Sequence, residues 1–125
     1  MDRPDPPESL ARGAIVADLS REIVRLHARL YGRGPTKARS YVQGEYAVCV
    51  LEDIFTTAER TLIEAGSGDH VRDTRKRLQE TVRQEFVETV GRITGRAVRV
   101  YLSQVDVGAS LALEFFIFAE PEGSG

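Results

Sequence analysis

The chain has 125 residues, 17 basic and 19 acidic side chains, a net charge of −2 and one cysteine. This length fits one domain, the charge argues against bulk electrostatic capture of nucleic acid, and a single cysteine excludes an internal disulfide and fits a reducing compartment. Because no apolar run approaches the roughly 20 residues of a spanning helix and no secretory signal core is present, we expect a soluble, cytoplasmic protein.

The N-terminal part predicts a tail followed by a helix. Residues 1–8 include three prolines and two aspartates and cannot bury enough apolar surface to become ordered, so we expect a disordered tail. Residues 121–125 are expected to be a flexible C-terminus, which leaves a single domain over residues 9–120. Ser9 is a candidate N-cap for a helix that reaches Tyr31. Its apolar residues recur at helical spacing: Ile15, Val16, Leu19, Ile23, Leu26 and Leu30. This helix could pack on its own domain or lie against a second copy.

The next segment predicts a turn and a β-hairpin. Gly32, Gly34 and Pro35 end the first helix, because glycine frees the backbone and proline cannot continue the hydrogen-bond ladder. Residues 39–42 and 46–51 have the composition of strands, and residues 43–45 form the tight turn between them. The second strand is apolar on both faces, which is typical of an interior strand, and Cys49 is expected to be a small core residue within it.

Two helices are predicted after this hairpin. Thr56 and Glu59 have the spacing of a capping box, which predicts a short helix ending at Gly66 with Leu62 and Ile63 turned inward. From Asp69, a candidate N-cap, to Gly95, a candidate left-handed C-cap, one long helix is predicted. Its apolar stripe comprises Val71, Leu78, Val82, Phe86, Val90 and Ile93.

A second hairpin completes the chain and defines the fold class. Residues 98–107 and 111–119 alternate in the manner of strands, with a turn at residues 108–110. The element order α-β-β-α-α-β-β predicts a two-layer α+β domain, in which helices pack on a four-stranded antiparallel sheet built from two hairpins. We place Leu111, Leu113, Phe115 and Ile117 toward the helices. The open face would then display Tyr101, Phe116 and Phe118, which we predict to form the interface of a homodimer.

Three features together resemble a known bacterial family: the segment Leu30-Tyr31-Gly32-Arg33-Gly34-Pro35 after the first helix, the segment Thr56-Thr57-Ala58-Glu59-Arg60, and the charged helix that ends at Gly95. Over about residues 9–120 the chain is similar to the family labelled as the MpsC-like component of a sodium-translocating, membrane-potential-generating system. The Tyr-Gly-Arg-Gly-Pro segment is the most specific element. The resemblance implies no cofactor and no catalytic residue set, and it implies a link to ion transport through a membrane partner.

No combination of residues predicts catalysis or metal binding. His27 and His70 lie in different elements without a cysteine or carboxylate at ligand spacing, so no metal site is proposed. Gly32 to Gly34 resembles half of a phosphate-binding loop. It follows a helix and precedes a strand, however, which is the reverse of the order that directs backbone N–H groups at a phosphate.

One stretch of the chain carries an excess of positive charge. No acid occurs between Glu22 and Glu45, and the same interval holds five basic residues: Arg25, Arg29, Arg33, Lys37 and Arg39. They could form an anion site. They could also complement the dipole at a helix C-terminus and pair with acids from elsewhere in the fold.

From these observations we predict a protein that is not an enzyme and that needs no cofactor. It would act as an accessory or regulatory domain through protein–protein contacts, linked by resemblance to the sodium-translocating system and to a membrane-associated partner. The alternative is an anion-binding or nucleic-acid-binding module that uses residues 25–39, although the net charge makes nucleic acid the weaker choice.

Overall fold

The computed structural model describes residues 8–121 and confirms the α+β fold class. Its elements follow in this order: α1 (Glu8–Tyr31), β1 (Lys37–Gln43), β2 (Tyr46–Glu52), α2 (Thr57–Glu64), α3 (Gly68–Thr81), α4 (Arg83–Thr94), β3 (Val98–Asp106) and β4 (Leu111–Phe118). The predicted order of helices and strands is confirmed. The long helix predicted over residues 69–95 is divided into α3 and α4. Of the tail predicted over residues 1–8, Glu8 belongs to α1 and residues 1–7 lie outside the described residues, as do residues 122–125 of the C-terminus predicted over 121–125.

The four strands form one antiparallel sheet in the order β1-β2-β4-β3. The central position of β2 confirms the prediction of an interior strand. Strand β3 lies at the edge, and its register with β4 shifts between Val98 and Val100. An extra residue at such a bulge increases the local twist of the strand.

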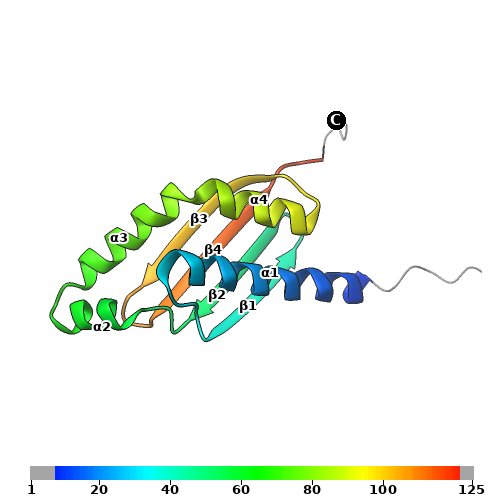
Figure 1. The fold of residues 1–125 in the computed structure, drawn as a ribbon. Coiled ribbons are helices and arrows are strands. Elements are labelled where there is room, and N and C mark those ends of the chain that lie inside the picture. Colours follow the sequence, from blue (N-terminus) through cyan, green and yellow to red (C-terminus); the bar gives the residue numbers. More distant parts are fainter. Residues whose placement is uncertain (1–7, 122–125) are drawn as a thin grey trace, which may run out of the picture.

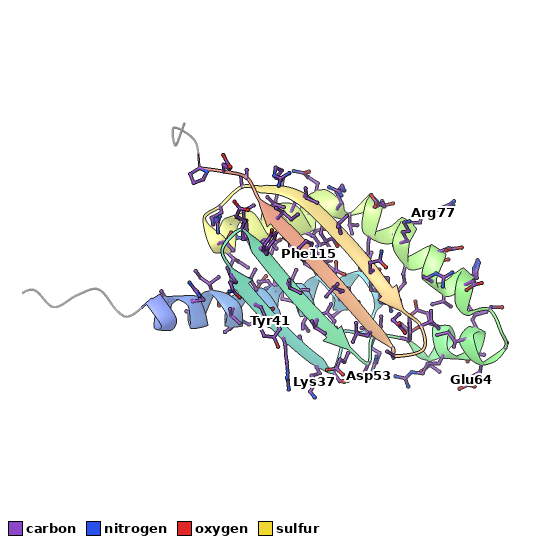
Figure 2. The ribbon with its side chains drawn as sticks, turned by 180° about the vertical axis from the view of Figure 1, so that it is seen from behind. Lys37, Tyr41, Asp53, Glu64, Arg77 and Phe115 are labelled. Carbon is purple, nitrogen blue, oxygen red and sulfur yellow. The ribbon has the colours of Figure 1, made fainter. Side chains whose placement is uncertain are left out.

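The helices all lie on one face of the sheet (Figure 1), and the other face is not covered (Figure 2). The core therefore lies between two layers, as expected for a helix-on-sheet architecture. Leu19 and Ile23 of α1, Phe86 and Val90 of α4, and Phe116 of β4 are buried in it.

Helix α1 packs within its own chain. It contacts β1, β2 and α4, and Ser20 is hydrogen-bonded to Ser40 of β1 at 2.7 Å. The sequence left open whether this helix packs on its own domain or against a second copy. In the structure it packs on its own domain, on the same face of the sheet as α3 and α4. Ser9 lies inside the helix rather than at its N-cap, since α1 already includes Glu8.

The prediction of one uninterrupted helix over residues 69–95 is wrong at Val82. This residue has φ −105° and ψ 14° and separates α3 from α4. Its carbonyl accepts from the amides of both Glu85 and Phe86, which tightens the turn. Arg83 then donates to the Tyr101 carbonyl on the edge strand at 2.8 Å. The break lets α3 continue along β3 while α4 turns toward α1.

The assignment of faces in the second hairpin is also wrong. Tyr101, Phe116 and Phe118 point toward the helices and are almost completely buried. Tyr101 stacks on Phe116 with ring centroids 4.9 Å apart. Successive side chains of a strand alternate between the two faces of the sheet. A wrong choice of the buried face therefore places every residue of the strand on the wrong side. The residues predicted as the interface are therefore part of the core.

The local signals for helix ends were right in two places and wrong at Asp69, which lies in the first turn of α3, after Ser67 at the N-cap. The Thr56–Glu59 capping box is present, with the Glu59 amide 3.1 Å from Thr56 Oγ1 and the Thr56 amide 2.9 Å from Glu59 Oε1. Gly95 is left-handed at φ 71°, as predicted. Within the short helix Ile63 packs against the core, but Leu62 remains exposed, which corrects the prediction that both turn inward.

Candidate functional site

A network of polar side chains lies buried between the helices and the sheet, centred on the completely buried carboxylate of Glu114 in β4. Glu114 Oε2 accepts a hydrogen bond from Ser103 at 2.7 Å. Glu114 Oε1 accepts from the hydroxyl of Tyr101 and, at 3.4 Å, from the amide of Gln79. Three donors from α3 and β3 therefore surround a single acceptor group. This arrangement compensates for the loss of water around the carboxylate.

The network extends to α1 through Gln79. Its amide group donates to Tyr101 at 2.7 Å, and its carbonyl oxygen accepts from the hydroxyl of Tyr31 at 2.7 Å. Burial raises the pKa of Tyr101 above its ordinary value, and the Glu114 carboxylate raises it further. Burial also raises the pKa of Tyr31. Both hydroxyls therefore remain protonated donors over the physiological pH range.

His27 of α1 lies beside this network without joining it. Its side chain is buried against Phe86 and Tyr31, and its Nε2 is 3.7 Å from Glu114 Oε2. Neither ring nitrogen has a hydrogen-bond partner among the described residues. His27 and the exposed His70 lie apart, and residues 8–121 contain no group of three potential metal-ligating side chains.

Arg75 of α3 forms a second buried polar unit next to the first. Its guanidinium donates to both carboxylate oxygens of Glu59 at 2.7 Å and to the Ile54 carbonyl at 2.8 Å. Its carbon Cζ lies 3.7 Å from the centroid of the Tyr31 ring. Burial acts to raise the pKa of Glu59, but hydrogen bonds from Arg75 and from the Thr56 amide outweigh it and lower the pKa. Arg75 is thus fixed in place by charge, hydrogen bonds and ring contact.

A cavity of about 200 Å³ between α3 and β3 reaches these two buried units from the surface. Its lining is mostly polar: Arg72, Asp73, Arg75, Lys76, Gln79, Ser103, Gln104 and Val105. The cavity is therefore chemically suited to a small polar ligand rather than to an apolar one.

The open face of the sheet is the second candidate site. The side chains on it belong to four rows across the strands, as the register shows: Lys37, Glu52, Leu111 and Asp106; Arg39, Val50, Leu113 and Gln104; Tyr41, Val48, Phe115 and Leu102; Gln43, Tyr46, Ile117 and Val100. Tyr41 and Leu102 are each 54% exposed. In three of the four rows both central residues, on β2 and β4, are apolar or aromatic, which is unusual for a surface that faces only water.

The structure does not bring the five basic residues of the predicted anion site together. Arg29 pairs with Glu85 of α4, and Arg33 donates to the Asp53 carboxylate at 2.7 Å and to the Asp53 and Phe55 carbonyls. These contacts match the interpretation in which the matching acids come from elsewhere in the fold. Arg25 lies on the exposed side of α1, beside Glu22. Lys37 and Arg39 lie on the opposite, open face of the sheet.

Cys49 is completely buried on the helix-covered face of β2, which confirms it as a core residue. Burial raises the pKa of its thiol to about 12, although a hydrogen bond from Ser40 acts to lower it. Since the thiolate is the reactive form, we expect no modification of the native protein by a thiol reagent at pH 8 and rapid modification in denaturant. Absorbance of the released chromophore measures this, and fast labelling of the folded protein would contradict the assignment.

Sequence reasoning missed Arg75, Gln79 and Glu114, the three buried groups around which the polar units form. A usable signal was present on α3, where Val71, Arg75 and Gln79 recur every four residues on one side of the helix. Two polar residues in line with a buried valine indicate a polar partner on the opposing layer. Glu114, isolated in an otherwise apolar strand, is that partner.

Fold and site together define a two-layer α+β domain with a buried polar network on its helical side and a largely apolar sheet face on the other. A family model confirms the resemblance noted in the sequence. The model described as "Na+-translocating membrane potential-generating system (MpsC)" matches residues 11–120, and the chain therefore belongs to the MpsC family. No curated protein and no solved structure matches the chain. Within residues 8–121 no helix has the length and apolarity needed to cross a membrane.

Proposed function

We propose that the chain is a non-enzymatic accessory domain of the membrane-potential-generating system for which its family is named, and that it works through protein–protein contacts as a homodimer. The open face of the sheet carries this proposal. Its exposed Tyr41 and Leu102 and the two apolar residues between them form one continuous row across the four strands. Aromatic and aliphatic groups of this kind are enriched at the centre of interfaces.

The arrangement of charge on this face favours a second copy of the same chain as its occupant. Lys37 on β1 and Asp106 on β3 lie in the same row but on opposite edges of the sheet. Three strand spacings of about 4.8 Å separate the two edges by roughly 14 Å, too far for a contact within one chain. The face is therefore basic at one edge and acidic at the other.

A two-fold axis close to parallel to the strands brings the basic edge of each copy against the acidic edge of the other. Such an axis, lying between two face-to-face sheets, places β1 of one copy opposite β3 of the other and keeps each row at its own level. Lys37 then meets Asp106 of the second copy, and Tyr41 meets Leu102. In the middle of the face, Phe115 meets Val48. The same surface is thus complementary to itself in charge and in apolarity.

The size of the face indicates a dimer of moderate affinity. Four strands spaced about 4.8 Å apart and about seven residues long cover roughly 450 Å² of projected area per copy. The accessible area of the side chains exceeds this projection, so the interface lies near the lower limit of stable assemblies. We expect dissociation on dilution in the micromolar range.

A charge swap tests the partner and the axis together. We expect Lys37→Glu and Asp106→Lys each to weaken the dimer, because each places like charges at both ends of the interface, and the double variant to restore it. Sedimentation velocity over a dilution series measures the dissociation constant. Arg77→Glu, on the solvent-facing side of α3, is the matched control that changes charge away from the face.

Each alternative has a distinct result. A wild-type chain that remains monomeric up to high micromolar concentration would leave the face to a different protein and overturn the second copy as its occupant. A dimer that withstands Leu102→Asp would place the interface elsewhere. A third result is that Leu102→Asp dissociates the dimer but the double charge swap does not restore the affinity lost in the single swaps. In that case the open face is the interface, and the proposed two-fold axis is wrong.

A further inference from the structure

The cavity between α3 and β3 presents one stripe of α3 to the edge strand. Arg72, Arg75, Lys76 and Gln79 are spaced three and four residues apart and therefore share a side of the helix. Ser103 and Val105 of β3 form the facing wall. This lining shares only Gln104 with the open sheet face, at the edge strand β3.

Basic side chains outnumber acidic ones in this lining, and one of the basic side chains has no acidic partner. The lining holds three cationic side chains and a single carboxylate, that of Asp73. Arg72 is paired with Asp69 at 3.0 Å and approaches Asp73 at 4.0 Å. Lys76 pairs with no acid among the described residues. The cavity mouth therefore carries an uncompensated ammonium group.

Arg75 contributes a donor that the protein itself does not satisfy. Its Nε and Nη2 atoms are occupied by Glu59 and the Ile54 carbonyl, but the buried Nη1 atom has no hydrogen-bond partner in residues 8–121. A buried donor without an acceptor destabilises the structure unless a ligand or water supplies one. Because the other two nitrogens of the guanidinium are held by Glu59 and Ile54, the direction of this third donor is fixed.

We propose that this cavity binds a small oxyanion of the phosphate or carboxylate type. Arg75 Nη1 and the Lys76 ammonium group donate to it, above a floor formed by Ser103 and Gln79, whose own donors are already bound to Glu114 and Tyr101. An oxyanion is preferred over a cation because three cationic side chains outnumber the Asp73 carboxylate in the lining. The cavity would hold about six waters at roughly 30 Å³ each, which leaves room for a small anion and some of its hydration.

The proposal is tested by calorimetric titration of the full chain with sodium phosphate and, separately, with sodium acetate, at constant ionic strength in a weakly coordinating buffer. We expect saturable binding of at least one of them, and the ratio of the two affinities distinguishes phosphate from carboxylate recognition. In Lys76→Gln we expect the affinity to fall about tenfold, the effect of losing one charge-assisted hydrogen bond. Arg77→Gln, one position along the helix and outside the cavity lining, should bind as the wild type does.

Arg75→Lys tests the buried donor directly, and its folding is checked by circular dichroism before titration. If that variant fails to fold, the comparison of Lys76→Gln with Arg77→Gln still decides the proposal. An absence of saturable binding of both anions at millimolar concentration would overturn it, as would equal weakening in Lys76→Gln and Arg77→Gln. Dimerisation does not enter these readouts, so the charge-swap experiment and this titration can fail independently.

Discussion

Replacing Phe86 by alanine is expected to lower the free energy of unfolding by about 3 to 5 kcal/mol. Phe86 is 1% exposed and forms one end of a stack of rings. It lies 5.9 Å from Tyr101, which in turn stacks on Phe116, and it meets His27 edge-on at 5.5 Å. Truncation removes these contacts and leaves a cavity where α1, α4 and the sheet meet. Urea denaturation followed by circular dichroism measures the change.

The matched control is Glu88→Ala on the same helix. Glu88 is exposed and contacts only Gln84, at 3.2 Å, through a surface hydrogen bond. A surface substitution of this kind changes stability by no more than about 0.5 kcal/mol. Similar losses in the two variants would mean that Phe86 is not part of the core, and would contradict the packing of α4 on the sheet.

Element order and two of the helix ends could be predicted because they depend on local chemistry. The Thr56 capping box and the left-handed Gly95 satisfy backbone groups of their own helices, so neighbouring residues suffice to specify them. The strands of both hairpins could be recognised from their alternation and the turns between them. The interior position of β2 followed from its apolar side chains on both faces.

The choice of face in the second hairpin could not be read from its alternation. In β4 one face holds four large apolar residues, whereas the other combines two phenylalanines with Ala112 and Glu114. Hydrophobicity alone favours burying the first set. The structure buries the second, in which Glu114 finds donors on α3 and β3. Those donors come from distant parts of the chain.

The break at Val82 has a similar origin. Nothing in the local sequence demands it, since neither glycine nor proline is present at that point. It arises because α3 and α4 pack against different partners, and Arg83 anchors the junction to the edge strand. The helical spacing of the apolar residues therefore runs without interruption through two separate helices. Local pattern identified the buried sides of the segment but not the change in its direction.

The polar network behind the sheet has consequences for specificity as well as for stability. A buried carboxylate is costly unless all of its donors are present, and donors without their acceptor are costly as well. Only a packing that brings Gln79, Tyr101 and Ser103 to Glu114 satisfies all of these groups. Alternative registers of β3 or positions of α3 would leave several of them unpaired. The network thus favours one arrangement of α3 on the sheet.

Glu114→Leu is therefore expected to destabilise the domain by about 3 to 5 kcal/mol, although leucine is apolar and of similar volume. The stability is lost because the hydroxyl groups of Tyr101 and Ser103 and the Gln79 amide would be buried without their acceptor, and not because a cavity forms. If this is the cause, removing the hydroxyls as well should recover stability. We expect the triple variant Glu114→Leu, Tyr101→Phe, Ser103→Ala to be clearly more stable than Glu114→Leu alone in urea denaturation.

The control for this comparison is the double variant Tyr101→Phe, Ser103→Ala, which keeps the carboxylate and removes two of its donors. It should also be destabilised, because Glu114 would then be buried with Gln79 as its remaining donor from the network. Additive losses across these variants would mean that the four groups do not act as a unit. Recovery in the triple variant would instead show that pairing within the network, rather than the presence of any one polar group, determines the stability of this layer.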